Sequence, residues 1–141
     1  MTEAVLDFRV PPQPHLSRVV RDSVADFALT HGVGSDDTAQ FLTALGEALA
    51  NAIEHARAER PIEVEVRIGF DRIVATVQDS GVGLPSGFAV DGPLPQPQAE
   101  RGRGLPLIRY CSDIFNVTSA PGAGTAVVLG RYLAARSSNV A

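Results

Sequence analysis

The sequence predicts an α+β two-layer sandwich, in which helices cover one face of a mainly antiparallel, mixed β-sheet. The first reason is the order of its periodic segments, which runs strand, helix, helix, two strands, short helix and two strands. The second is size, since 141 residues, 45% of them apolar, can bury a core without disulfides. We therefore expect one domain over residues 1–141.

The first half of the chain contains one strand and two helices. Residues 4–10 alternate apolar and polar side chains, as a half-buried strand does. Over about 15–30 and about 35–58, apolar residues recur every three or four positions, which predicts two helices with one buried stripe each. Ser35, followed by two aspartates, is expected to cap the second helix. Pro61 then favours extended chain around it.

The second half continues with short elements around one aperiodic segment. Residues 62–69 and 72–78 are rich in Val and Ile and are joined by a short link, which predicts a hairpin. A short helix over about 104–111 and strands near 114–119 and 124–132 follow.

Two segments lack a period. Residues 80–103 are rich in Gly and Pro, which in a compact domain is typical of a functional lid or an insertion. Residues 133–141 are expected to form a loose tail.

Composition excludes several classes of protein. All 12 basic residues are Arg, and the absence of Lys excludes a P-loop NTPase, the strand lysine of protein kinases and Schiff-base chemistry. A net charge of -4 with no basic run argues against direct nucleic-acid binding. The single cysteine, Cys111, allows no internal disulfide and argues against a zinc site. The sequence shows no signal peptide and no membrane span, so we expect a cytoplasmic protein.

The first polar motif lies on the second predicted helix. Glu47, Asn51 and His55 follow at steps of four residues, and each step turns the helix by only 40°, so the three side chains share one stripe. A carboxylate and an amide oxygen beside small alanines can hold a hydrated Mg²⁺ and orient an attacking hydroxyl. The alternative is an ordinary solvated helix face.

The second motif follows the strand predicted over 72–78. Asp79 can accept a hydrogen bond from the amino group of a planar base, and Gly81 and Gly83 let the backbone approach that base closely. The alternative is an ordinary turn, since Asp-Ser-Gly is common turn chemistry.

The third motif leads from the aperiodic segment into the short helix. Arg101, Gly102, Arg103 and Gly104 come before Leu105, and free backbone N–H groups at a helix start suit a triphosphate. The two arginines can add charge-assisted bonds to phosphate oxygens. A basic hinge without a ligand is the alternative.

A fourth motif, Gly124-Thr125, opens the last predicted strand and by itself reads as a hairpin loop.

In this order the four motifs resemble the nucleotide-binding boxes of the GHKL, or histidine kinase-like, ATPase superfamily. The matching residues are Glu47, Asn51 and His55 of the N box, Asp79, Gly81 and Gly83 of the first glycine box, Gly102 and Gly104 of the second, and Gly124-Thr125. The resemblance covers most of the chain and implies the Bergerat-type ATP-binding fold. A free-standing domain with Glu-Ala-x-x-Asn-Ala-x-x-His looks most like the bacterial anti-sigma factor serine/threonine kinases of the RsbW and SpoIIAB kind.

The resemblance implies a role for each residue of the N box and for the aspartate. Glu47 would be the catalytic general base toward an acceptor serine, and Asn51 would ligate Mg²⁺ beside the bound ATP. Asp79 would bind the adenine amino group. His55 is expected to pack and order its helix rather than to transfer a proton.

The remaining matched residues would surround the nucleotide. The base would pack against Gly81 and Gly83. The phosphates would be wrapped by residues before and at the start of the short helix, namely Gly102, Arg103, Gly104 and Leu105. The adenine end would be supported by Thr125. Whether Arg101 or Arg103 contacts the γ-phosphate stays open, because the family's arginine stands slightly earlier.

The function that the resemblance implies is an ATP- and Mg²⁺-dependent anti-sigma factor kinase. It would sequester a sigma factor and phosphorylate a serine on an anti-anti-sigma partner of the STAS type, and the resemblance also implies a homodimer. The alternative is a nucleotide-dependent binding module, a partner switch without phosphotransfer.

Overall fold

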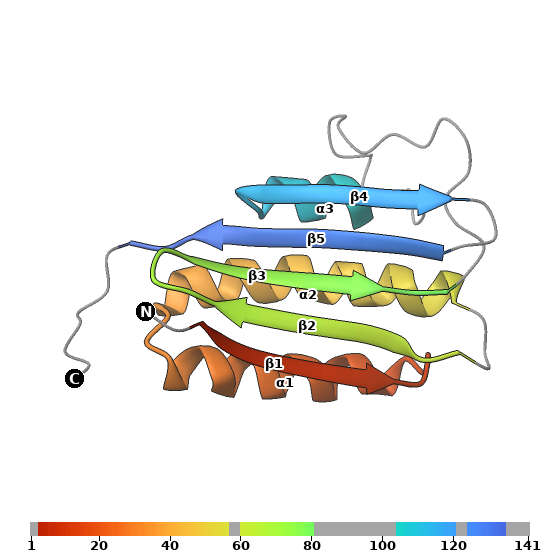
Figure 1. The fold of residues 1–141 in the computed structure, drawn as a ribbon, viewed down its shortest axis with the longest axis horizontal. Helices are drawn as coiled ribbons and strands as arrows, with labels where there is room; N and C mark the ends of the chain where they lie inside the picture. The colour runs from red at the N-terminus through yellow and green to blue at the C-terminus, as the bar shows by residue number, and fades with distance from the viewer. Residues whose placement is uncertain (1–2, 57–59, 81–103, 121–123, 135–141) are drawn as a thin grey trace.

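The structure, a computed structural model, describes residues 3–56, 60–80, 104–120 and 124–134. Within these residues, three helices and five strands lie in two layers, with the helices behind one face of the sheet (Figure 1). In chain order the elements are β1 (Ala4–Val10), α1 (His15–Thr30), α2 (Ser35–His55), β2 (Ile62–Ile68), β3 (Arg72–Gln78), α3 (Gly104–Tyr110), β4 (Ile114–Ala120) and β5 (Gly124–Tyr132). The predicted α+β sandwich is confirmed.

The sheet has the strand order β1-β2-β3-β5-β4. Each of the four pairings among the described strands is antiparallel. The last strand, β5, therefore lies inside the sheet, between β3 and β4. Gln78 at the end of β3 pairs with Ala126 near the start of β5, which places two distant stretches of sequence side by side.

The register aligns one apolar row on each strand toward the helices. Val66 pairs with Leu6 on one side and with Ala75 on the other, and Val77 pairs with Val127. Because side chains alternate between the two faces of a strand, these rows share the helix-covered face. The largest fully buried side chains are Phe41, Leu45, Leu49, Ile62, Ile73, Ile108, Leu129, Val20, Val24, Val64 and Val66.

The ends of α1 and α2 follow local backbone rules. Gly32 adopts a φ of 77° after α1, and Val33 N–H donates to the Ala28 carbonyl at 3.0 Å, which closes the helix by a Schellman-type turn. The prediction that Ser35 caps α2 is wrong. Gly34 is the N-cap residue, with extended backbone and no side-chain cap bond, and Ser35 is already helical. Glycine is one of the residue types favoured at helix N-caps, so it can occupy this position without a side-chain hydrogen bond.

The second helix ends at His55, short of the predicted end near residue 58, and residues 57–59 lie outside the described part. The predicted lid lies outside it from residue 81 to 103, and the predicted tail from residue 135 onward. Leu133 is still hydrogen-bonded, since its N–H donates to the Asp71 carbonyl at 2.8 Å. Within the described residues, no helix has the length and apolar character needed to cross a membrane.

Candidate nucleotide-binding site

The end of β3 and the start of β5 are joined by a buried acid. Asp79 is 4% exposed and Thr125 is 7% exposed. The Asp79 N–H donates to the Thr125 carbonyl at 2.9 Å, and the Thr125 N–H donates to Asp79 Oδ1 at 3.2 Å. The backbone pairing thus continues one residue beyond β3. The bond from Thr125 N–H to Oδ1 fixes the orientation of the Asp79 carboxylate.

Gly124 allows this close approach. Its φ is 86°, which only glycine adopts readily, and a Cβ at this position would lie 2.1 Å from the Asp79 carbonyl oxygen. That separation is far inside van der Waals contact, so any side chain here would push β5 away from the end of β3. The glycine that reads as an ordinary hairpin residue in the sequence is therefore a packing requirement of the site.

Two further residues support the same junction. Gln78 Nε2 donates to the Asp79 carbonyl at 2.7 Å and lies 3.4 Å from the Thr125 carbonyl. Ser119 Oγ and Thr125 Oγ1 lie 3.1 Å apart and share a hydrogen bond. Sequence reasoning missed Gln78 and Ser119, because each occupies an ordinary strand position whose neighbours become known only from the strand order.

A narrow pocket opens between α2 and this junction. Its polar lining residues are Asn51, His55, Asp79 and Thr125, and its other residues are small or apolar: Ala48, Ala52, Val77 and Val127. Two helix residues and two strand-end residues of the predicted site are thereby brought together. Small and apolar side chains beside an acid suit a planar base that carries an amino group.

Asn51 and His55 face this pocket from successive turns of α2. His55 Nε2 lies 3.9 Å from Glu54 Oε2, which makes an ion pair only when the imidazole is protonated. The packing role of His55 stays a prediction.

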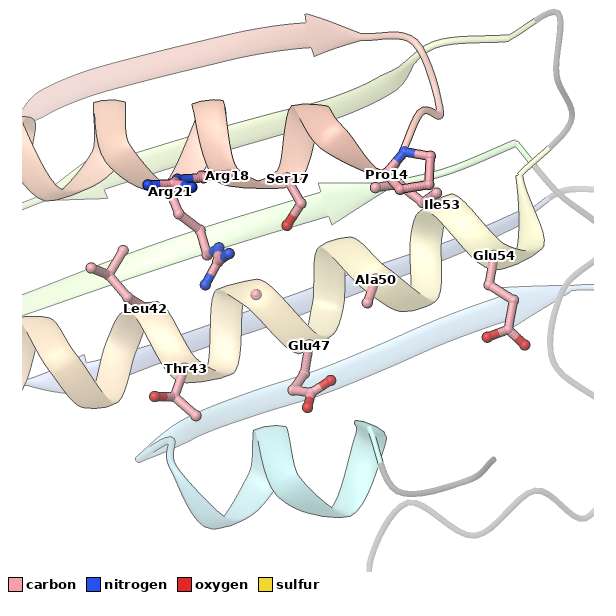
Figure 2. A pocket seen from close by; sticks show the side chains of 11 residues that line it. Pro14, Ser17, Arg18, Arg21, Leu42, Thr43, Glu47, Ala50, Ile53 and Glu54 are labelled. Atoms are coloured by element: carbon pink, nitrogen blue, oxygen red, sulfur yellow. The ribbon is translucent and has the colours of Figure 1, made fainter. Parts of the chain in front are cut away.

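Glu47 lies apart from this pocket. It lines a groove of about 700 Å³ on the outer side of α1 and α2, and in Figure 2 its carboxylate points away from α1 toward the side of α3. The other lining residues are Pro14, Ser17, Arg18, Arg21, Leu42, Thr43, Gly46, Ala50, Ile53 and Glu54. Glu47 and Asn51 are four residues apart, so their directions around the helix differ by about 40°. This difference places Asn51 at the pocket and Glu47 at the groove.

Glu47 is close to the end of α3. The pKa of the Cys111 thiol is raised chiefly because the thiol is buried; the charge of Arg131 lowers it and the charge of Glu47 raises it. The Glu47 carboxylate is thus electrostatically coupled to the residue that directly follows α3.

A divalent cation fits Asn51 if other ligands come from outside the protein. Among the described residues no three His, Cys, Asp or Glu side chains form a group that could hold a metal by themselves. The N box supplies one amide oxygen at the pocket, from Asn51, while the Glu47 carboxylate lies at the outer groove. Mg²⁺ is commonly held by one or two protein oxygens together with substrate phosphates and waters, so this sparse donor set suits it.

The phosphate-binding residues of the sequence prediction lie mostly outside the described part. Gly104 is the first residue of α3 and Leu105 the second. The predicted residues of which the structure describes nothing are Gly81, Gly83, Arg101, Gly102 and Arg103.

The fold and this pocket define a class of protein, an α+β fold with a buried acid at a strand end and an Asn-bearing helix beside it. Residues 10–131 match the histidine kinase-like ATPase domain, and the chain belongs to this family.

Curated relatives have similar length. The chain is 31% identical over 119 residues to an anti-sigma F factor of Oceanobacillus iheyensis, covering 80% of this chain and 82% of that protein. It is 33% identical over 128 residues to an anti-sigma F factor of Pasteuria penetrans, covering 86% and 85%. It is 30% identical over 142 residues to the serine-protein kinase RsbW of Bacillus velezensis, covering 91% and 85%.

Solved structures share the fold at lower identity. The RsbU and RsbW domains of Rv1364c from Mycobacterium tuberculosis align with a TM-score of 0.68 at 19% identity, over 94% of this chain and 34% of that chain. The mycobacterial sensor histidine kinase MprB aligns with a TM-score of 0.58 at 15% identity, over 94% and 98%.

Proposed function

We propose that this protein is an ATP-binding anti-sigma factor and serine/threonine kinase that phosphorylates an anti-anti-sigma partner. The observation that carries the proposal is the junction of β3 and β5, where Asp79 is buried and oriented beside a pocket that also contains Asn51. The curated relatives named as anti-sigma F factors and as a serine-protein kinase support the same function.

The adenine end of the nucleotide binds at this junction. Asp79 accepts a hydrogen bond from the adenine amino group, and its orientation is fixed because Oδ1 already accepts from Thr125 N–H. Gly81 and Gly83 pack against the base. Gln78 holds the backbone from the other side of the junction through its bond to the Asp79 carbonyl.

The phosphates lie toward the start of α3. Gly102, Gly104 and Leu105 wrap them with backbone N–H groups, and Arg101 or Arg103 contacts the γ-phosphate. Asn51 is the protein ligand of Mg²⁺, which when bound neutralises part of the phosphate charge.

Glu47 accepts the proton of the attacking serine hydroxyl. The serine oxygen forms the new bond to the γ-phosphorus, the bond to the β-phosphate oxygen breaks, and ADP leaves. The position of Glu47 at the outer groove, one helical turn from Asn51, lets an acceptor polypeptide approach from solvent while the nucleotide occupies the inner pocket.

The partners follow from the same proposal. They are a sigma factor and an anti-anti-sigma protein of the STAS type, and the kinase acts in the cytoplasm, with a homodimer as its proposed assembly.

A second candidate is a partner switch that binds ATP without transferring phosphate. The separation of Glu47 from the pocket favours it, because Asn51, Asp79 and Thr125 can bind a nucleotide without the carboxylate.

Labelled ATP distinguishes the two candidates. The purified protein is mixed with γ-labelled ATP, Mg²⁺ and a STAS-type protein, and label on the partner is measured alongside ATP affinity. We expect Glu47→Gln to abolish transfer and to retain ATP binding. Glu54→Gln is the matched control, since Glu54 lines the same groove and should transfer as the wild type does. Tight ATP binding by the wild type with no labelled serine would leave the partner switch as the function.

A further inference from the structure

Arg131 is a charged residue on the face of the sheet that packs against the helices. Side chains alternate along β5, so Arg131 lies on the same face as Val127 and Leu129, which are both buried in the core. Its side chain is 22% exposed. A charge placed at the end of a buried apolar row is costly unless its donors are hydrogen-bonded, so its partners indicate its purpose.

The guanidinium of Arg131 bonds to two other elements. Nε and Nη2 donate to Asp37 Oδ1 at 3.2 and 3.1 Å, and Nη1 donates to the Cys111 carbonyl at 3.2 Å. Asp37 lies in the first turn of α2, and Cys111 directly follows the last residue of α3. One side chain therefore joins the start of α2, the end of α3 and the end of β5; we call these contacts the Arg131 clamp.

The same three elements carry the candidate site at their opposite ends. Asn51 lies about 21 Å along α2 from Asp37, at about 1.5 Å per residue. Thr125 lies about 20 Å along β5 from Arg131, at about 3.3 Å per residue. The third element, α3, begins at Gly104, which directly follows the predicted phosphate-binding residues in the sequence. At these distances Arg131 does not contact the nucleotide and acts through the elements that it holds.

The clamp sits where α3 packs beside α2. Figure 2 shows the Glu47 side chain directed from α2 toward the side of α3. The charge of Glu47 also acts on Cys111, the residue whose carbonyl the clamp holds. A shift of α3 would therefore change the distance between α3 and the face of α2 that carries Glu47 and Asn51.

We propose that Arg131 is a positioning residue for the phosphate end of the site: it fixes α3 against the Glu47 face of α2 and so sets where the γ-phosphate lies. This inference rests on the proposed nucleotide-dependent function. The adenine end is held separately, by the bonds between Asp79 and Thr125. Loss of the clamp should therefore weaken ATP binding more than ADP binding, because only ATP carries the γ-phosphate.

The test uses the full chain with Arg131→Met and with the milder Asp37→Asn. Asp36→Asn is the matched control, since Asp36 lies in the same first turn and the clamp does not include it. Calorimetry with MgCl₂ gives the ATP and ADP affinities, and hydrogen exchange of residues 104–112 is measured without nucleotide. We expect Arg131→Met to lower ATP affinity about tenfold or more and ADP affinity by less than about threefold. Asp37→Asn removes the charge but keeps an oxygen that can accept from Arg131, so it should lower ATP affinity less, but again more than ADP affinity. Exchange of residues 104–112 should become faster.

The outcomes separate this inference from the kinase proposal. Equal weakening of ATP and ADP, or a lower unfolding midpoint with the wild-type affinity ratio, would overturn the positioning role, and so would the same effect in Asp36→Asn. If Arg131→Met does not fold, Asp37→Asn is judged by the same criterion. If the wild type transfers no phosphate, the kinase proposal fails, but the affinity ratio still decides the role of Arg131. If it does transfer phosphate, kcat should fall more than KM for ATP rises, with partial rescue by Arg131→Lys.

Discussion

Replacing Gly124 by alanine tests the closest approach in the candidate site. The new Cβ would lie 2.1 Å from the Asp79 carbonyl oxygen and 2.8 Å from the Ser80 Cα, both of them backbone atoms that cannot rotate away. The φ of 86° adds strain of about 1–2 kcal/mol for a residue with a side chain. We therefore expect β5 to separate from the end of β3.

The magnitude follows from the bonds that this separation breaks. Asp79 and Thr125 share hydrogen bonds of 2.9 and 3.2 Å, the second to a carboxylate. Their loss costs about 2–4 kcal/mol, so with the backbone strain Gly124→Ala should lower the free energy of unfolding by about 3–6 kcal/mol. ATP affinity should fall at least about tenfold, because the Asp79 carboxylate loses its fixed orientation.

Urea unfolding followed by circular dichroism, and calorimetry with ATP, measure both effects. Gly69→Ala is the neutral control, since its Cβ would meet only side-chain atoms of Glu3, at 3.7 and 3.8 Å, which is ordinary van der Waals contact. Gly130→Ala separates stability from binding, because its Cβ would lie 2.6 Å from the Ile73 carbonyl oxygen at the far end of β5. It should lower the unfolding midpoint; since Gly130 adjoins Arg131, binding is compared with ADP, whose affinity should change by less than about threefold. A Gly124→Ala protein with the wild-type unfolding midpoint and ATP affinity would refute the reasoning.

Two further predictions concern Asp79 and Cys111. Asp79→Asn should weaken ATP binding by about 10- to 100-fold, as expected for losing a charged acceptor. Its unfolding midpoint should change little, since the amide oxygen can still accept from Thr125 N–H; unchanged ATP affinity would refute the adenine contact. Burial raises the pKa of the Cys111 thiol, so the folded state keeps this proton to higher pH than the unfolded state does. Stability should therefore fall as the pH rises past the ordinary thiol range of about 8–9. Cys111→Ala should remove this part of the slope in urea unfolding measured from pH 7 to 10, and an unchanged slope would contradict the assignment.

Local periodicity was sufficient to predict the elements of this fold. The apolar spacing of α2 and the alternation in β2 and β3 are properties of neighbouring residues, so the sequence contains them directly. The helix cap was predicted wrongly, since Ser35 has suitable chemistry but Gly34 occupies the capping position. That choice depends on the backbone path after α1, which residue preferences alone do not determine.

The site was predictable only in part, for a different reason. Motif spacing pointed to Asn51 and Asp79, and the structure places both at one pocket. Their proximity depends on how the helix and the strands are arranged, and alternation identifies the faces of a strand but not its partners. The separation of Glu47 from the pocket also needed the structure, because a helical stripe does not show where one wall of a cavity ends. In the sequence, Arg131 could be recognised only as a charged residue at a position that continues the alternating apolar row of the last strand.

The insertion of β5 between β3 and β4 also bears on how the protein forms during synthesis. Until residues 124–132 have left the ribosome, β3 has an open edge and β4 lacks the strand to which it is hydrogen-bonded in the finished sheet. The acid at the end of β3 then has no Thr125 to orient it. A growing chain can therefore pair β1, β2 and β3 early, but its nucleotide pocket is complete only after its last strand has entered the middle of the sheet.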